Sequence, residues 1–232
     1  MSRVELLYRL QQVDTELDVE RRRLQEVEAS LGETEELRQA RARLEQSGAA
    51  HRRWRATLQD LELKMAALED KIKNSERRLY SGMVKNPKEL ENLQGELAYL
   101  RRRKSVEEDT LLEAMINVEE HEAAWQDAQV HWEIVEAAWK ASQAALAQER
   151  EDLLIHLPEL TELRATREKA VDDVDLETYE NLRRRKGGTA VALLKGSLCT
   201  SCHVEVPSSM LQLARQGETL AFCGSCGRIL FA

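Results

Sequence analysis

The sequence between Pro87 and Pro158 contains no other proline and a single glycine, Gly95. Within it, leucine, valine and tryptophan recur at seven-residue spacing in a column that runs from Leu90 to Leu146. A seven-residue apolar repeat gives a helix one narrow stripe, which is buried when two helices wind around each other. Because few residues here could end a helix, the pattern predicts a long helix that packs along a seam.

A second heptad pattern occupies the first eighty residues. It starts with leucines spaced by seven from Leu10 and continues from Leu37 to Leu79, after a shift of one residue near Gly32. Such a shift changes the supercoil locally and does not have to end the helix. The pattern therefore predicts one helix over residues 2–80, with a kink at Gly32 or Gly48.

The stretch LYSGMVKNPKEL separates the two patterns. Gly82 permits a left-handed helix ending, and Asn86 followed by Pro87 fits an N-cap and a first helical position. The chain is therefore expected to turn near residues 80–88 and form an antiparallel coiled-coil hairpin. Folding about this turn would place Leu44 beside Trp125.

Three residues of this turn are not required by its geometry. Met83, Val84 and Lys85 play no part in the turn, and Lys88 follows close by. An exposed Met-Val pair beside two lysines is a candidate partner-binding site, although loop residues of this kind are often incidental.

The last third of the chain has a different pattern. Pro158 is expected to break or restart the helix. The segment VDDVDLETYENLRRRKGG has an Asp N-cap, a basic last turn and a glycine stop, and TAVALL has the composition of a strand. The predicted fold is mostly α, with a coiled-coil hairpin over residues 1–170 and a helix plus zinc-ribbon domain over residues 171–232.

All four cysteines lie in two CxxC units, separated by 20 residues: Cys199 with Cys202, and Cys223 with Cys226. Two such pairs at this interval are typical of a tetrahedral zinc site with four thiolates. A c-type haem would leave the second pair without a role, and a thioredoxin-like pair needs a βαβ setting. Four thiolates would fill the coordination shell of the ion, so we expect one structural Zn²⁺. A ligand set with three cysteines and His203 is the alternative.

The charge of the chain bears on its partners. There are 34 Lys+Arg and 42 Asp+Glu, giving a net charge of −8, which opposes strong nonspecific binding to nucleic acid. The run Arg183, Arg184, Arg185 and Lys186 is either a nucleic-acid contact or a basic helix C-terminus favoured by the helix dipole. The sequence shows no secretory signal and no membrane-spanning stretch, so a cytoplasmic protein without membrane insertion is expected.

Three motifs carry a resemblance over essentially the whole chain: LYSGMVKNPKELENLQGEL, YENLRRRKGGTAVA, and CTSCH with FCGSCGRIL. Together they resemble the bacterial C4-type zinc-ribbon proteins with an N-terminal coiled-coil hairpin. The resemblance implies that the four cysteines bind zinc. It also implies a chaperone or adaptor that engages flagellar or type III secretion components or the nitrogen-type sigma factor, and an RNA-binding role is proposed in the family.

The expected function follows from these features. The sequence offers no nucleophile–base pair, phosphate-binding glycine loop or open metal site, so neither an enzyme nor a small-molecule substrate is expected. We expect a non-enzymatic adaptor or chaperone that binds protein partners, linked to secretion or transcription machinery. The alternative is a DNA- or RNA-binding regulator that uses the ribbon and the basic segment.

Overall fold

The computed structural model describes residues 2–232, which form a mostly helical fold with one small sheet. The helices are α1 (Arg3–Ser30), α2 (Glu35–Tyr80), α3 (Pro87–Glu168), α4 (Asp173–Arg185) and α5 (Ser208–Gln216). The strands are β1 (Val191–Lys195), β2 (Leu198–Cys199) and β3 (Ile229–Phe231), in the order β2-β1-β3. β1 is antiparallel to β2 and parallel to β3. The predicted fold class is confirmed.

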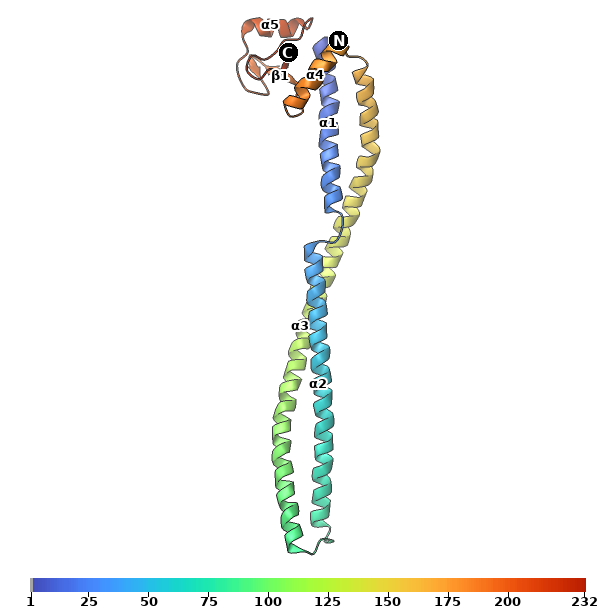
Figure 1. Cartoon of the computed structure of the whole chain (residues 1–232), viewed down its shortest axis with the longest axis vertical. Coiled ribbons are helices and arrows are strands. Elements are labelled where there is room, and N and C mark those ends of the chain that lie inside the picture. Colours follow the sequence, from blue (N-terminus) through green and yellow to red (C-terminus); the bar gives the residue numbers. More distant parts are fainter. Residues whose placement is uncertain (1) are drawn as a thin grey trace. The chain divides into compact units, whose positions relative to one another are not determined.

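The chain divides into two compact units. The hairpin unit, residues 33–141, contains α2 and the first part of α3, which lie side by side and antiparallel (Figure 1). The ribbon unit, residues 2–32 and 142–232, contains α1, the last part of α3 and the whole C-terminal region.

The prediction of one helix over residues 2–80 is wrong, because the chain leaves the helix between Ser30 and Glu35. Gly32 has φ 128°, a conformation that side chains disfavour. Its N–H donates to Oε1 of Gln143 at 2.8 Å, and Nε2 of Gln143 donates to the carbonyl of Ser30 at 3.3 Å. Thr34 then caps α2 by accepting from the N–H of Leu37 at 3.3 Å. The shift in the heptad pattern is thus accommodated by restarting the helix.

The prediction that Pro158 breaks the helix is also wrong, since α3 continues through it to Glu168. Because proline has no N–H, the carbonyl of Leu154 lacks its usual helical donor. Pro158 is exposed, so water can donate a hydrogen bond to this carbonyl instead. Leu160 is buried against α1, and Leu157 packs on the same cluster, so the helix is held on both sides of the proline.

We expect Pro158→Ala to raise the free energy of unfolding by about 2 kcal/mol. Proline costs about 3 kcal/mol relative to alanine inside a helix, and its restriction of the unfolded chain offsets up to about 1 kcal/mol of this. The midpoint of urea unfolding, followed by circular dichroism at 222 nm, measures the change. Leu160→Ala is the opposite control and should lower the midpoint, and an unchanged midpoint for Pro158→Ala would contradict the expectation.

The hairpin pairs its two apolar columns one heptad away from the expected register. Trp125 stacks on His51, with ring centroids 5.3 Å apart, whereas the fold-back about the turn placed it beside Leu44. Gly48 faces the same indole, since a Cβ there would lie 3.2 Å from its Nε1. Columns that repeat every seven residues match equally well after a shift of seven, so the sequence pattern does not distinguish the two registers.

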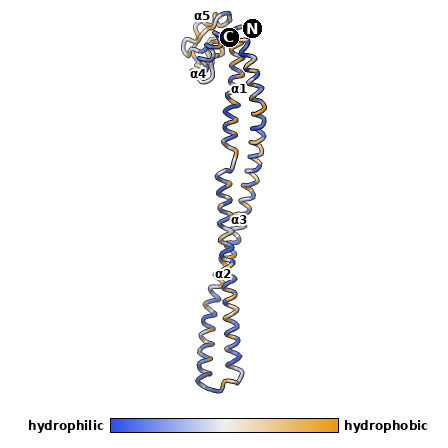
Figure 2. The backbone as a smooth tube through the Cα atoms, turned by 45° about the vertical axis from the view of Figure 1, so that its right-hand side comes forward, coloured by the Kyte–Doolittle hydropathy of each residue, from blue (hydrophilic) through white to orange (hydrophobic). Residues whose placement is uncertain are grey.

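The interior of the hairpin unit is a narrow seam. Figure 2 shows hydrophobic positions interspersed along largely hydrophilic helices. One cluster buries Leu37, Ala40 and Val135 and packs them against Trp132 and Trp139. Both tryptophans therefore pack in the seam between the two helices.

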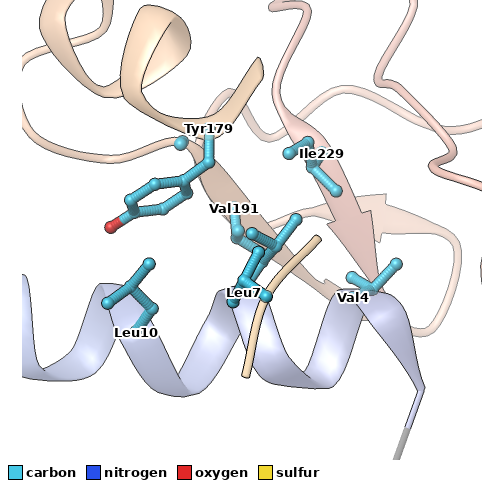
Figure 3. Packing of buried hydrophobic residues seen from close by; sticks show 8 residues of the cluster. Val4, Leu7, Leu10, Tyr179, Val191 and Ile229 are labelled. Carbon is cyan, nitrogen blue, oxygen red and sulfur yellow. The ribbon is translucent and has the colours of Figure 1, made fainter. Parts of the chain in front are cut away.

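The ribbon unit has a broader core. Figure 3 shows α1, α4 and two strands contributing to one cluster, whose labelled members are Val4, Leu7, Leu10, Tyr179, Val191 and Ile229. A second cluster packs α5 against the sheet and includes the cysteines. The sheet therefore contributes residues both to the cluster with α1 and α4 and to the cluster that contains the cysteines.

Candidate functional site

The two CxxC units lie in two neighbouring turns of the ribbon. Cys199 ends β2 and Cys202 follows in the next turn, while Cys223 and Cys226 flank the turn before β3. The Sγ atoms of Cys199 and Cys226 are 3.9 Å apart, and those of Cys202 and Cys223 are 3.7 Å apart. All four Sγ atoms lie within 4.8 Å of one another. The structure thus brings together the four residues that the sequence singles out.

The spacing of the sulfurs fits a zinc ion. With Zn–S bonds of about 2.3 Å, the sulfurs of a tetrahedral site are about 3.8 Å apart. The two distances above bracket this value. Four sulfur donors fill the tetrahedral shell, which characterises a structural zinc and leaves no open position for substrate.

His203 has a different part in the ribbon. Its N–H donates to the carbonyl of Cys199 at 2.8 Å, and the N–H of Gly227 donates to the carbonyl of Cys223 at 2.8 Å. The two turns are therefore closed by equivalent backbone hydrogen bonds. His203 has φ 58° and Gly227 φ 71°, so both occupy the left-handed position that follows a CxxC unit. The imidazole is exposed and does not belong to the sulfur cluster, so the ligand set that includes it is not supported.

The surroundings of the sulfurs act differently on the two sides of the site. Burial raises the pKa of the Cys199 thiol to about 11. Burial also opposes ionisation of Cys226, but hydrogen bonds from the backbone and side chain of Arg228 outweigh it and lower the pKa to about 7. The guanidinium of Arg228 is held by the carbonyls of Thr189 at 2.9 Å and Lys186 at 3.0 Å. A fixed positive charge therefore lies beside Cys226 and offsets part of the negative charge of its thiolate.

The fold and the metal centre define a coiled-coil hairpin protein with a four-thiolate zinc ribbon. The family described as the CT398-like coiled coil hairpin domain matches residues 10–187, and the C4-type zinc ribbon domain matches residues 198–230. The chain belongs to the CT398-like coiled-coil hairpin family, and its ribbon carries one structural zinc. The resemblance stated from the sequence is confirmed.

Similar proteins support the same fold. A solved structure from Mycobacterium smegmatis has TM-score 0.65 and 24% identity and covers 100% of both chains. CT398 from Chlamydia trachomatis has TM-score 0.62 and 18% identity, over 99% of this chain and 94% of that one. The HP0958 protein from Helicobacter pylori has TM-score 0.51 and 16% identity, over 99% and 97%. The uncharacterized protein Rv2229c of Mycobacterium tuberculosis is 28% identical over 190 residues, 76% of this chain and 75% of that protein.

The turn of the hairpin unit carries the second set of predicted residues. Met83 is 85% exposed, Val84 is half-buried, and Lys85 and Lys88 are exposed. Met83 and Val84 contribute to a groove of about 630 Å³. Its other lining residues come from the end of α2: Arg77, Arg78, Tyr80 and Ser81. Sequence reasoning missed these residues, although the run ERRLY directly before the turn was a signal.

The turn is held by other side chains. Oγ of Ser81 donates to the carbonyl of Arg78 at 3.0 Å and accepts from the N–H of Met83 at 3.3 Å. Gly82 has φ 71°, and Oδ1 of Asn86 accepts from the N–H of Lys88 at 3.1 Å. The side chains of Met83 and Val84 make none of these bonds, so the turn does not require them.

The residues of the predicted basic run have different surroundings in the structure. Nη2 of Arg183 donates to Asp18 at 2.5 Å, and its Nε lies 3.7 Å from Oδ2 of Asp14. Arg184 and Arg185 are exposed, and the former donates to the side chain of Asn181 at 2.8 Å. Arg183 therefore holds α4 against α1, and only part of the run is available to a partner.

Asp14 is a site that the sequence analysis missed. Its carboxylate is 1% exposed and accepts from the hydroxyl of Tyr179 and from Nε of Arg164, each at 2.7 Å. Arg164 also contacts Glu168 and Glu180. Burial, together with the hydrogen bond to Asp14, raises the pKa of Tyr179 above its ordinary range. A carboxylate between Leu10 and Leu17 on the apolar stripe was the signal that could have revealed this cluster.

Gln11 is a second missed residue. Its buried Oε1 accepts from the backbone N–H of Ala190 at 2.7 Å and of Val191 at 2.6 Å. Its Nε2 donates to the carbonyl of Val191 at 2.8 Å. One amide thus satisfies three backbone groups at the start of β1 and fixes the ribbon to α1.

Proposed function

We propose that this protein is a non-enzymatic, cytoplasmic adaptor or chaperone that captures a protein partner at the turn of its hairpin unit. The observation behind the proposal is Met83, whose side chain is 85% exposed and lines an apolar groove. The hydrogen bonds that hold the turn do not involve this side chain. Exposed apolar surface of this kind is a common mark of an interaction site. A link to secretion or transcription machinery is part of the proposal.

The metal centre supports a non-enzymatic role. We propose Cys199, Cys202, Cys223 and Cys226 as the zinc ligands, which would leave the ion no position for water or substrate. The zinc would then stabilise the ribbon. Among residues 2–232, no helix is long and apolar enough to cross a membrane.

The alternative is a nucleic-acid-binding regulator. Arg184 and Arg185 favour it, because both are exposed at the end of α4. Two arginines offer few phosphate contacts on a chain of net charge −8, so this alternative has less support than the adaptor.

Affinity purification from the native host after crosslinking tests the proposal. Half of each sample is treated with nuclease, and recovered proteins are identified by mass spectrometry. We expect a defined protein to be recovered from both halves, and recovery to fall at least tenfold with the double variant Met83→Ser, Val84→Ser.

The matched control replaces two exposed apolar residues on α3, away from the turn. Val130→Ser with Ile134→Ser makes the same kind of change at positions that are 57% and 63% exposed, and it should leave recovery unchanged. Loss of all recovered protein after nuclease would contradict the adaptor and favour the nucleic-acid alternative.

A further inference from the structure

We infer that the hairpin turn binds an acidic amphipathic segment of another protein, whose apolar side chains enter the groove and whose carboxylates pair with its basic rim. This inference rests on the proposed function and adds the chemistry of the partner.

The first observation is the charge around the turn. Residues 71–88 include six basic residues and one acidic residue, Glu76. Glu76 is already paired, since its Oε1 accepts from Nη2 of Arg101 at 2.6 Å. The whole chain has a net charge of −8, so the turn is a basic patch on an acidic protein. The six basic residues are Lys71, Lys73, Arg77, Arg78, Lys85 and Lys88.

The second observation is that the cations at the groove lack partners. Within residues 2–232, Arg77, Arg78, Lys85 and Lys88 make no ion pair, although all four are exposed. Arg77 and Arg78 line the groove, whereas Lys85 lies in the turn and Lys88 at the start of α3. These four unpaired positive charges complement an acidic ligand.

The third observation is the apolar character of the groove. Tyr80 is 76% exposed and lines it together with Met83 and Val84. Methionine is flexible and polarizable, so it can pack against apolar side chains of different shapes. A helix or extended segment with a few apolar anchors fits such a groove, as in other helix-in-groove complexes.

The combination of groove and rim selects among anionic ligands. A nucleic acid backbone would pair with the cations but would leave Met83 and Val84 without an apolar partner. An anionic membrane surface would contact the protruding side chains and would leave the concave groove unfilled. A protein segment with both carboxylates and apolar residues satisfies both parts.

Peptide-phage selection tests the inference with the full-length, zinc-loaded chain as bait. A library of random 16-residue peptides is selected on the wild type and, in parallel, on the variant Met83→Ser, Val84→Ser. We expect peptides enriched on the wild type to be net negative with several apolar residues, and to be at least tenfold less enriched on the variant.

A titration of the leading peptide then separates the two parts of the site. By fluorescence anisotropy, Lys85→Glu with Lys88→Glu should weaken binding at least tenfold, and the affinity should fall as salt is raised. The control variant Val130→Ser, Ile134→Ser should bind as the wild type does. Peptides without acidic bias, or with equal enrichment on the Met83/Val84 variant, would overturn the inference.

Parallel titrations with phosphatidylglycerol vesicles, a 20-nucleotide RNA and a labelled second copy of this chain examine the other occupants. Binding of any of these that depends on Met83 and Val84, in the absence of acidic peptides, would overturn the inference. The adaptor proposal fails separately: a host protein recovered equally well by the Met83/Val84 variant would leave an adaptor that uses another surface.

Discussion

Replacing Cys223 by Ala is expected to lower the zinc content from one ion per chain to almost none and to unfold the ribbon. Cys223 is buried, and its Sγ lies 3.7 Å from that of Cys202. Structural zinc sites supply on the order of 10 kcal/mol to the folding of small domains. The ribbon buries few large side chains besides the cysteines, so its own core cannot replace this contribution.

Zinc content is measured by plasma mass spectrometry, and limited proteolysis reports the folding of residues 198–230. The helical signal at 222 nm should largely persist, because the hairpin unit has its own interior. His203→Gly is the matched control within the same motif, and it should retain one zinc because glycine readily adopts the φ of 58° found there. A folded, zinc-loaded Cys223→Ala protein would contradict the four-thiolate assignment.

Replacing Asp14 by Ala is expected to destabilise the ribbon unit by about 3–5 kcal/mol, the usual cost of removing one partner from a buried ion pair. The carboxylate is 1% exposed, so water does not screen its interactions. Its loss would leave Nε of Arg164 and the hydroxyl of Tyr179 without their acceptor, while the other two nitrogens of Arg164 keep Glu168 and Glu180. Both of these groups hold α1 to its neighbours in the ribbon unit.

Urea unfolding at neutral pH measures this loss. Tyr179→Phe is the control, because it removes one donor and leaves the ion pair with Arg164 in place. It should cost about 1 kcal/mol. If Asp14→Ala were no more destabilising than Tyr179→Phe, the buried cluster would not stabilise the fold as described.

Local signals in the sequence are sufficient for part of the structure. The CxxC spacing predicts the zinc, because two pairs of soft ligands at that interval leave few alternatives. The turn signals at Gly82 and Asn86 locate the hairpin, because they act on the backbone of their own segment. The Asp N-cap and glycine stop around α4 are local in the same sense, and Asp172 does cap this helix.

Features that depend on distant contacts were not predictable. The break near Gly32 is held by Gln143, more than a hundred residues away, and a skip in a heptad pattern is equally compatible with a continuous helix. Helix α3 survives Pro158 because the proline is exposed and Leu160 is packed. The hairpin register has an ambiguity of one heptad, and the partners of Asp14 come from α3 and α4.

A photo-crosslinking residue at position 83 tests most directly whether the hairpin turn captures a protein. The full-length protein carries p-benzoylphenylalanine in place of Met83 in the native host, and a second strain carries it in place of the exposed Ile134. We expect irradiation to yield a protein adduct that resists nuclease and forms from position 83 but not from position 134. Adducts that disappear with nuclease, or that form equally from both positions, would contradict capture of a protein partner at the turn.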